Sequence, residues 1–344
     1  MPAKIRRFLH IAVAETLHYT GALALWRWYR RTVRGREEVC VLGLHRVLTW
    51  DEQERSNSLD GMVIRENTYL ELLAYLRRRF RVVGLDDLAS ASGRNSDSTE
   101  PMCVITFDDG WEDTYSRAFP GLKKYGMPAV VFLATGAIGS IGGFWVERVK
   151  QAWRAPVTRE RMKSAIQEHA VAMVKGSGDL EHLVEWLKRM PSAKRNAILD
   201  HLLACEGNVE NGASIDAMLT WEQAREMSRE DVEIGAHTVS HPLLTYEEPD
   251  AVERELKISK QILEQKLGKQ VRAFAYPNGD WNEQVRKQVQ EAGYQWAFTT
   301  HPGWHKAREN CHTISRVLLH EGNITTRDGE FSPAMLNLTL AGWA

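Results

Sequence analysis

Two alternating periodicities constrain the fold of this chain more than any other feature of its sequence. From residue 39 onward, short runs rich in β-branched residues alternate with longer segments in which apolar residues recur at helical spacing. Such repeated βα units are typical of a parallel sheet covered by helices. The expected strands are residues 39–45, 81–85, 102–107, 128–135, 232–236, 271–275, 295–299 and 313–319. Seven or eight parallel strands predict an α/β barrel.

The longer segments between these strands are the expected helices. They are residues 66–80, a short helix that begins at Asp86, and residues 111–125, 251–267 and 282–292. The segment 145–219 differs because it has no strand pattern, and its helical stretches are rich in Arg, Lys and Glu. We therefore expect a domain at 39–344 that is interrupted by an all-helical insertion at about 145–219.

Residues 1–38 precede the first expected strand and differ in charge from the rest of the chain. The first 36 residues have a net charge of +7, whereas the whole chain has −1. Apolar residues recur there at roughly helical spacing, namely Leu9, Val13, Leu17, Ala24 and Trp28. The pattern predicts a basic amphipathic helix. This helix either packs on the main domain or makes a peripheral contact with a membrane through residues 1–36.

The apolar stretch 8–26 has the wrong form for a signal peptide or a membrane span. Polar residues interrupt it, and no small-residue cleavage site follows it. A helix that crosses a bilayer needs about 20 predominantly apolar residues. We therefore expect a location in the cytoplasm or peripheral to the inner membrane face.

Charge and cysteine content exclude some classes of partner and site. A net charge of −1 provides no electrostatic reason for the whole molecule to bind nucleic acid. The four cysteines are scattered without a C-x-x-C pair, which favours reduced thiols over a disulfide framework or a cysteine zinc site.

Two carboxylates, Asp108 and Asp109, follow the expected strand 102–107 in the run Thr-Phe-Asp-Asp-Gly. Active sites of α/β barrels lie at the C-terminal ends of the strands. Adjacent ionised acids repel each other, and a bound cation relieves that repulsion. The alternative is that the run is only a turn, with Asp109 as the cap of the helix that follows.

Two imidazoles, His237 and His241, follow the expected strand 232–236 in the run His-Thr-Val-Ser-His-Pro. Alone, this spacing can arise by chance on a protein surface. Together with one carboxylate, however, two neutral imidazoles form a three-ligand site for zinc or a related divalent ion, with a position left open for water. With Asp109, His237 and His241 as ligands, Asp108 would accept a proton from the water.

Three motifs together resemble the polysaccharide deacetylase family, which has the NodB homology domain and is also called carbohydrate esterase family 4. They are Thr-Phe-Asp-Asp-Gly, His-Thr-Val-Ser-His-Pro and Phe-Ala-Tyr-Pro-Asn-Gly at 274–279, in this order and spacing, and the resemblance covers about residues 39–320. It implies a distorted (β/α) barrel, with Asp108 as catalytic base and a divalent metal ion, expected to be zinc, on Asp109, His237 and His241. It also implies hydrolysis of an N-acetyl amide on an amino sugar.

The third motif departs from the family pattern at one position. The family often has Arg-x-Pro-x-Gly, in which the arginine steadies the catalytic aspartate, but Ala275 stands at the arginine position here. Something else must then orient Asp108. By position in the motif, the resemblance assigns to the backbone N–H of Asn278 a role in binding the oxyanion.

The proton donor to the departing amine has two candidates. The run Leu318-Leu-His320 resembles the family's final Leu-x-His motif, which implies that His320 is the acid. His45, in a run similar to the Tyr-His-Arg-Val of many such deacetylases, is the rival donor or a substrate contact. Three tryptophans at or beside expected strand ends are candidates for stacking on sugar rings or for core packing: Trp111, Trp145 and Trp281.

The family resemblance leaves the substrate open. Besides polysaccharides, proteins of this family act on lipid-linked amino sugars and small amides by the same chemistry. A basic N-terminal helix would suit a substrate close to a membrane. From a different class, the chain could be a carbohydrate-binding relative without turnover, for which the missing arginine is the one argument.

Overall fold

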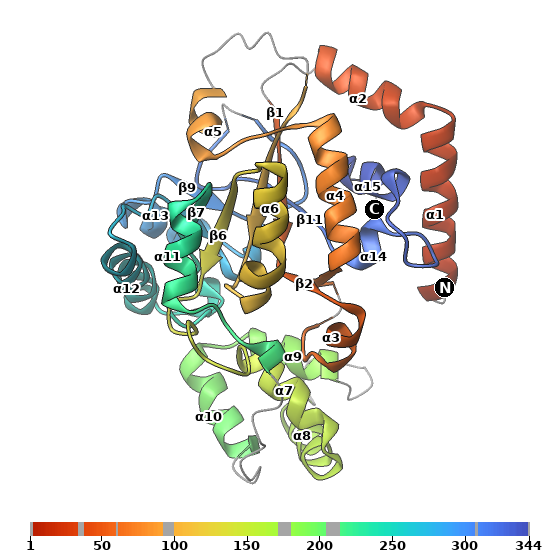
Figure 1. The fold of residues 1–344 in the computed structure, drawn as a ribbon. Coiled ribbons are helices and arrows are strands. Elements are labelled where there is room, and N and C mark those ends of the chain that lie inside the picture. Colours follow the sequence, from red (N-terminus) through yellow and green to blue (C-terminus); the bar gives the residue numbers. More distant parts are fainter. Residues whose placement is uncertain are drawn as a thin grey trace.

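The computed structural model describes residues 3–33, 38–59, 61–91, 100–170, 180–203, 214–306 and 309–342. At its centre is a curled sheet with the strand order β10-β1-β5-β6-β7-β8-β9, in which β11 also pairs with β1 and β4 with β5 (Figure 1). The strands are β1 (Glu38–Leu44), β4 (Arg81–Val82), β5 (Met102–Phe107), β6 (Ala129–Leu133), β7 (Val232–Ala236), β8 (Ala273–Ala275), β9 (Trp296–Phe298), β10 (His305–Lys306) and β11 (Val317–Leu318). Only β10 runs antiparallel to its neighbour in this sheet, among the residues described.

The last segment of the sheet brings its two ends together. Ile314 forms a bridge with Phe298 of β9, and β11 then pairs with Leu42 and Gly43 of β1. The α/β fold with a distorted barrel is therefore confirmed. The expected strand 313–319 is shorter than predicted, because the chain crosses from one neighbour to the other and makes no continuous ladder with either.

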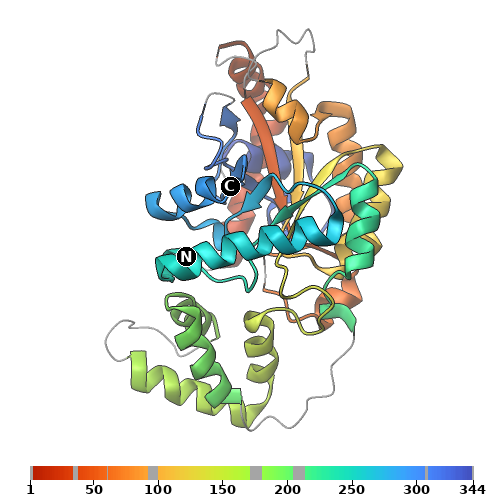
Figure 2. The ribbon, with the colours of Figure 1, turned by 90° about the vertical axis from the view of Figure 1, so that its left-hand side faces the viewer.

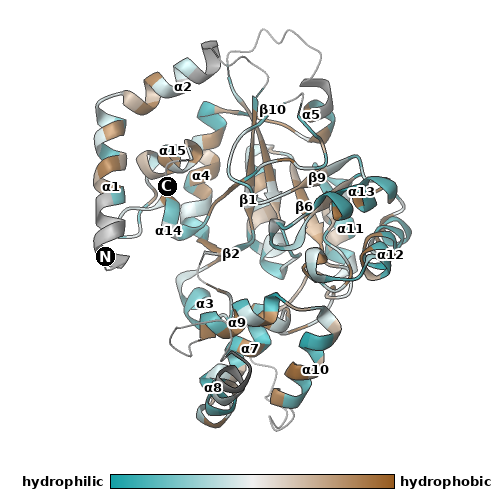
Figure 3. Ribbon diagram, turned by 180° about the vertical axis from the view of Figure 1, so that it is seen from behind, coloured by the Kyte–Doolittle hydropathy of each residue, from teal (hydrophilic) through white to brown (hydrophobic). Residues whose placement is uncertain are grey.

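The strands of the barrel are buried on both faces, which explains their nearly continuous apolar sequences. Alternate residues of β1 enter different cores: Val39 and Val41 pack inside the barrel with Phe132 and Phe298, whereas Cys40 and Leu42 pack against the outer helices. Figure 3 shows hydrophobic strands at the centre and hydrophilic faces on the outer helices. The helices outside the sheet are α4 (Glu66–Arg79), α5 (Leu85–Ala91), α6 (Phe119–Tyr125), α11 (Trp221–Arg229), α12 (Pro249–Leu267), α13 (Glu283–Glu291), α14 (Glu321–Ile324) and α15 (Pro333–Leu340).

Two further local features differ from the sequence prediction. The expected helix 111–125 is a π-helix at Thr114–Ala118 followed by α6, because Pro120 lacks the amide hydrogen that a regular helical ladder needs there. A small two-stranded sheet of β2 (Arg46–Leu48) and β3 (Val63–Arg65), with α3 (Trp50–Arg55) between them, was not predicted.

Four helices form a separate group at one end of the barrel, as the side view in Figure 2 shows. They are α7 (Trp145–Arg154), α8 (Pro156–Ala170), α9 (Leu180–Lys188) and α10 (Ser192–Leu203). They share a small apolar core of their own, to which Val149, Met162, Leu183 and Leu199 contribute. These helices occupy the chain segment in which the sequence predicts an insertion.

The N-terminal segment was predicted as one helix, and this was wrong. The chain turns at Thr20 and Gly21, where Gly21 has a φ of +77°, and two helices result, α1 (Ala3–Tyr19) and α2 (Ala22–Val33). Helix α1 packs on α15 through a small cluster of Ile11, Ala14, Leu17, Ala334, Met335 and Leu338. Residues 34–37 of the predicted basic segment lie outside the described residues.

Candidate metal centre

The two predicted pairs of polar residues meet at the C-terminal edge of the barrel. Asp108 and Asp109 directly follow β5, and His237 directly follows β7. Asp109 has a φ of +76° and Gly110 one of +87°, so the chain turns sharply as soon as the strand ends. Asp108, Asp109 and His237 are each only 2% exposed.

Three donor atoms converge on one point. Asp109 Oδ1 lies 3.5 Å from His237 Nε2 and 3.4 Å from His241 Nε2, and the two Nε2 atoms are 3.1 Å apart. A tetrahedral zinc ion bonded to such atoms at about 2.0–2.1 Å requires them to lie roughly 3.3 Å apart. The described residues therefore fit a divalent metal ion.

Hydrogen bonds to the other polar atoms of His237 and Asp109 orient the donor atoms toward the site. His237 Nδ1 donates a hydrogen bond to the carbonyl of Ala275 at 2.7 Å, which leaves the lone pair of Nε2 directed at the site. Trp111 Nε1 donates to Asp109 Oδ2 at 3.0 Å, so the other oxygen, Oδ1, faces the histidines. Burial alone would raise the pKa of Asp109, but the imidazoles of His237 and His241 hold it below its ordinary value.

The histidine loop has an unusual backbone that other residues stabilise. Thr238 and His241 have φ values of +69° and +54°, which L-residues rarely adopt. Thr238 Oγ1 accepts a hydrogen bond from the amide of His241. The carboxylate of Glu255, on α12, accepts from the amides of Val239 at 2.6 Å and Ser240 at 3.0 Å. Sequence reasoning missed Glu255, because nothing local links it to the loop.

Arg316 orients Asp108, although Ala275 occupies the position where an arginine was expected. Its Nη1 and Nη2 each lie 2.7 Å from one oxygen of Asp108, and its Nε donates to the carbonyl of Thr299 at 2.8 Å. Arg316 is fully buried. Burial would raise the pKa of Asp108, but the guanidinium outweighs this effect and lowers it. The only signal for Arg316 in the sequence is a lone cation inside the expected strand 313–319.

The two candidate proton donors follow neighbouring strands. His45 follows β1, and its Nε2 lies 3.9 Å from Asp108 Oδ2. His320 follows β11 by two residues and caps α14, where its Nδ1 accepts a hydrogen bond from the amide of Gly322 at 3.1 Å. In a neutral His320 the proton therefore resides on Nε2.

Asn278 lies in the turn that follows β8. It has a φ of +58° and is exposed. Its carbonyl accepts a hydrogen bond from Thr300 Oγ1 at 3.0 Å. The next residue, Gly279, has a φ of +76°, and a Cβ there would come within 2.0 Å of Thr300 Oγ1, so only glycine fits this turn.

The start of the helical insertion lies against the metal ligands. The ring of Phe144 is centred 4.6 Å from that of His241. Glu147, on the first turn of α7, is 3% exposed, and burial together with the charge of Asp109 raises its pKa to about 8. Of the three tryptophans proposed for sugar stacking, Trp111 is excluded, since it is fully buried and bonded to Asp109. Sequence reasoning missed both Phe144 and Glu147.

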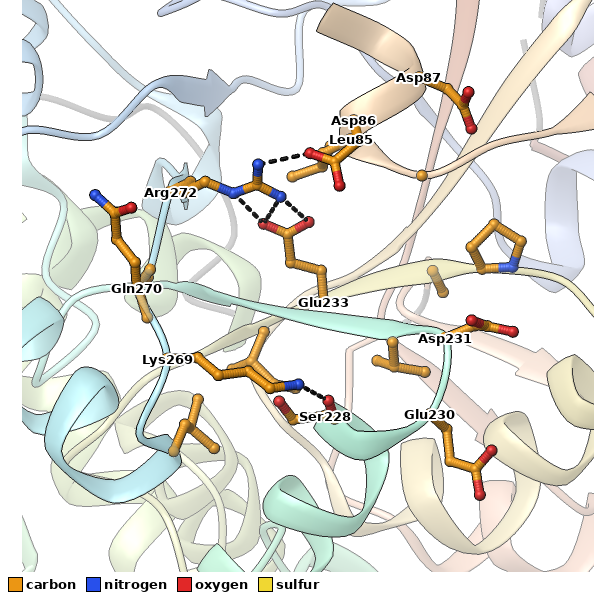
Figure 4. Close-up of a pocket in the computed structure, with 17 residues that line it drawn as sticks. Leu85, Asp86, Asp87, Ser228, Glu230, Asp231, Glu233, Lys269, Gln270 and Arg272 are labelled. Atoms are coloured by element: carbon orange, nitrogen blue, oxygen red, sulfur yellow. Dashed lines mark hydrogen bonds and ion pairs between the residues drawn. The ribbon is translucent and has the colours of Figure 1, made fainter.

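A cavity lies at the opposite edge of the barrel. It has a volume of about 540 Å³ and is lined by the first residues of β6 and β7 and by Arg272, which precedes β8. Figure 4 shows that Arg272 is bonded to Glu233 and Asp86 within this cavity. These two carboxylates thus already neutralise Arg272. The cavity is distinct from the metal centre, because none of the metal-type donors lines it.

Comparison with known proteins agrees with this geometry. Residues 95–297 match the family model described as polysaccharide deacetylase. YxkH of Bacillus subtilis (strain 168), whose name likewise refers to polysaccharide deacetylation, is 24% identical over 237 residues, or 69% of this chain. The match spans only 58% of the length of that relative.

Solved structures of similar fold have low sequence identity to this chain. The deacetylase PplD of Streptococcus pyogenes, in complex with acetate, has a TM-score of 0.57 at 20% identity, over 88% of this chain and 98% of its own. A de-N-acetylase of Aggregatibacter actinomycetemcomitans has a TM-score of 0.56 at 16% identity, over 88% of this chain and 100% of its own. At such identities these structures establish the fold alone.

Proposed function

We propose, from the premise that this chain belongs to the polysaccharide deacetylase family, that it hydrolyses an N-acetyl amide on an amino sugar of a polysaccharide and releases acetate. The observation that carries the proposal is the convergence of three metal-type donor atoms beside a carboxylate that Arg316 keeps ionised. The catalytic domain is residues 39–344, with the helical insertion at about 145–219.

Asp109, His237 and His241 would hold the divalent metal ion, for which zinc is our choice. When bound, the ion would polarise the amide carbonyl and make a water molecule more acidic. The support comes from the three donor separations and from the bond of His237 Nδ1 to Ala275, which fixes the tautomer that a metal ligand needs.

Asp108 is the general base that removes a proton from the attacking water. Its pKa is low, so it is ionised at neutral pH, and Arg316 holds both of its oxygens. Arg316 also meets the requirement that Ala275 left open, namely a cation that orients this carboxylate.

The departing amine needs a proton, and the two histidines after β1 and β11 are the candidates. His320 is the favoured donor because its capping bond places the proton of the neutral ring on Nε2. His45, whose Nε2 lies 3.9 Å from Asp108 Oδ2, serves as the rival donor or as a substrate contact. The backbone N–H of Asn278 stabilises the oxyanion.

Two alternatives use the same site. The amidase chemistry could act on a lipid-linked sugar or a small amide. A carbohydrate-binding relative without turnover had one supporting argument, the absent arginine at Ala275, and the ion pair of Arg316 with Asp108 now weighs against it.

Acetate release tests the proposal directly. The protein is incubated with N-acetylated oligosaccharides from chitin, peptidoglycan and exopolysaccharide, with added Zn²⁺ and after chelation. We expect acetate from at least one polymer class, loss of release on chelation and recovery on metal addition. Full activity after verified metal removal would overturn the metal mechanism, and no release from any class would favour the binding alternative.

The chain also makes a peripheral contact with an anionic membrane through its N-terminal helices. Among the described residues, none of the helices is long and apolar enough to cross a bilayer. Of the ten exposed large hydrophobic side chains in the described part of the chain, five nevertheless lie in one short part of α1 and α2: Val13, Tyr19, Leu25, Trp28 and Tyr29. Together with a net charge of +7 over residues 1–36, this composition suits the interface of an anionic bilayer.

Vesicle sedimentation tests this contact, with the substitution of Trp28 by serine compared with that of Trp50. Both tryptophans are more than half exposed, but Trp50 lies outside the N-terminal helices. We expect the full chain to sediment with phosphatidylglycerol vesicles at low salt, Trp28→Ser to sediment less, and Trp50→Ser to match the wild type. Equal binding of all three proteins would overturn the contact.

A further inference from the structure

We propose that Trp111 and Arg46 are positioning residues for the metal ligand Asp109, and that Asp216, at the end of the helical insertion, holds them in place. The inference rests on the proposed metal site. It assigns a role to a buried cluster that neither the metal donors nor Asp108 explain.

Trp111 decides which oxygen of Asp109 faces the site. Its indole Nε1 donates to Oδ2 at 3.0 Å, while Oδ1 lies within 3.5 Å of both histidine nitrogens. A carboxylate that is held by one oxygen cannot rotate freely, so the other oxygen stays available to a cation in one direction. Such partners of metal ligands commonly change metal affinity about 10–100-fold when they are removed.

Arg46 fixes the plane of the Trp111 ring. Its guanidinium carbon lies 4.2 Å from the centre of the ring, a cation–π contact in which both partners are fully buried. Burial would lower the pKa of Arg46, but Asp113 and Asp216 raise it, so the group remains a cation.

Several segments hold Arg46 itself. Its Nε lies 2.9 Å from Asp113 Oδ2, and its Nη1 lies 2.7 Å from both Ser58 Oγ and Asp216 Oδ1. Its Nη2 donates to the carbonyl of Ile215. The guanidinium therefore has one orientation, which sets the position of the indole ring beneath it.

The chain that returns from the helical insertion completes the arrangement. Trp111 forms a β-bridge with Met218, and Ile141 forms one with Ala217. The amide of Leu219 also donates to the carbonyl of Gly110 at 2.9 Å. The returning segment thus lies between the residues just before the insertion and the loop that carries Asp109. The insertion is joined at its base to the metal ligand through Asp216, Arg46 and Trp111.

Trp111→Phe is the sharpest test, because phenylalanine keeps an aromatic ring under Arg46 but lacks the indole N–H; the volume that it also loses is matched by the same change in the control. The matched control is Trp304→Phe, since Trp304 Nε1 donates at 2.9 Å to the carbonyl of Leu340, on α15. Zinc affinity of the purified full chain is measured by competition with a chromophoric chelator, together with a thermal melt. We expect Trp111→Phe to bind zinc about 10–100-fold more weakly than wild type and Trp304→Phe to bind within about twofold of it.

Asp216→Asn tests the link to the insertion. It also tests the inference independently if the Trp111→Phe variant does not fold. Glu66→Gln is its control, because Glu66 pairs with Arg117 at 2.8 Å in another part of the fold. We expect a smaller loss of zinc affinity for Asp216→Asn, about threefold to tenfold, and none for Glu66→Gln.

The outcomes separate this inference from the proposed function. Folded variants at Trp111 and Asp216 that bind zinc like the wild type would overturn the inference alone. A wild-type protein that binds no divalent metal would overturn the metal mechanism, and this inference with it.

Discussion

The two edges of the barrel carry ionic clusters of opposite character. At the C-terminal edge, Asp108 and Asp109 are 2% exposed, and an arginine, an indole and two imidazoles surround them. At the N-terminal edge, the side chains of Arg272 and Glu233 are each 25% exposed, and that of Asp86 is 83% exposed (Figure 4).

The difference lies in what each cluster leaves unsatisfied. In the cavity at the N-terminal edge, Arg272 bonds to both oxygens of Glu233 and to Asp86, so each of these charges already has a partner. At the metal centre, by contrast, three electron-rich atoms lie within 3.5 Å of one another with their outer partners already in place. The donor atoms at the C-terminal edge are therefore buried and held by their outer partners, but no cation among the described residues neutralises the point on which they converge.

The largest effect that would test this comparison is expected for Asp108→Asn. The amide cannot accept the proton of the attacking water, so we expect acetate release to fall about 10²–10⁴-fold. Zinc affinity should remain within a few-fold of wild type, because Asp108 is not among the three donors. Acetate assays and chelator competition measure the two quantities. Retained turnover would show that another group is the base.

Arg316→Gln should have the next largest effect. Removing one partner of a buried ion pair leaves an uncompensated charge, which commonly costs about 3–5 kcal/mol of unfolding free energy. Arg316 lowers the pKa of Asp108, so without it burial raises that pKa, and Asp108 is protonated at a higher pH. The acid limb of the pH–rate profile should therefore move to higher pH. Denaturant melts and the pH profile measure both effects; an unmoved acid limb would refute the role of Arg316.

Glu255→Ala should have an intermediate effect at the same edge. The carboxylate accepts hydrogen bonds from the amides of Val239 and Ser240, and losing such charge-assisted bonds costs about 1–3 kcal/mol. The loop that carries His241 should then bind zinc more weakly, as chelator competition would detect. Glu253→Ala, on the exposed face of the same helix, is the control. Equal zinc affinity for both variants would show that the loop needs no support from α12.

Arg272→Gln, at the opposite edge, should have the smallest effect. Solvent reaches this half-buried pair, so its contribution should be nearer the roughly 0–1 kcal/mol of surface ion pairs than that of Arg316 with Asp108. We expect a smaller loss of stability than for Arg316→Gln and no change in acetate release or zinc affinity. The variant is the direct counterpart of Arg316→Gln in the same assays. A loss as large as that of Arg316→Gln would erase the distinction between the two edges.

The sequence predicted those parts of the fold that depend on near neighbours. Met102–Phe107 and Val232–Ala236 begin and end as expected, since a run of buried β-branched and apolar residues is itself the signal for a central strand. The sequence predicted the bounds of the shorter strands less accurately, and it did not predict the π-helix before α6 or the break between α1 and α2. These depend on a single proline, a turn, or a neighbouring strand that lies far away in the chain.

The chemistry at the strand ends followed from the sequence by itself. A buried strand that ends in two acids and another that ends in two histidines must present these groups at one edge of a parallel sheet, whatever the detailed packing. Only the tertiary structure decided what holds them. Arg316 reaches Asp108 across 208 residues, and Asp216 reaches Arg46 across 170, so no local pattern indicates either pair. The physical reason is that a buried charge requires a partner but does not specify from which strand, loop or insertion that partner comes.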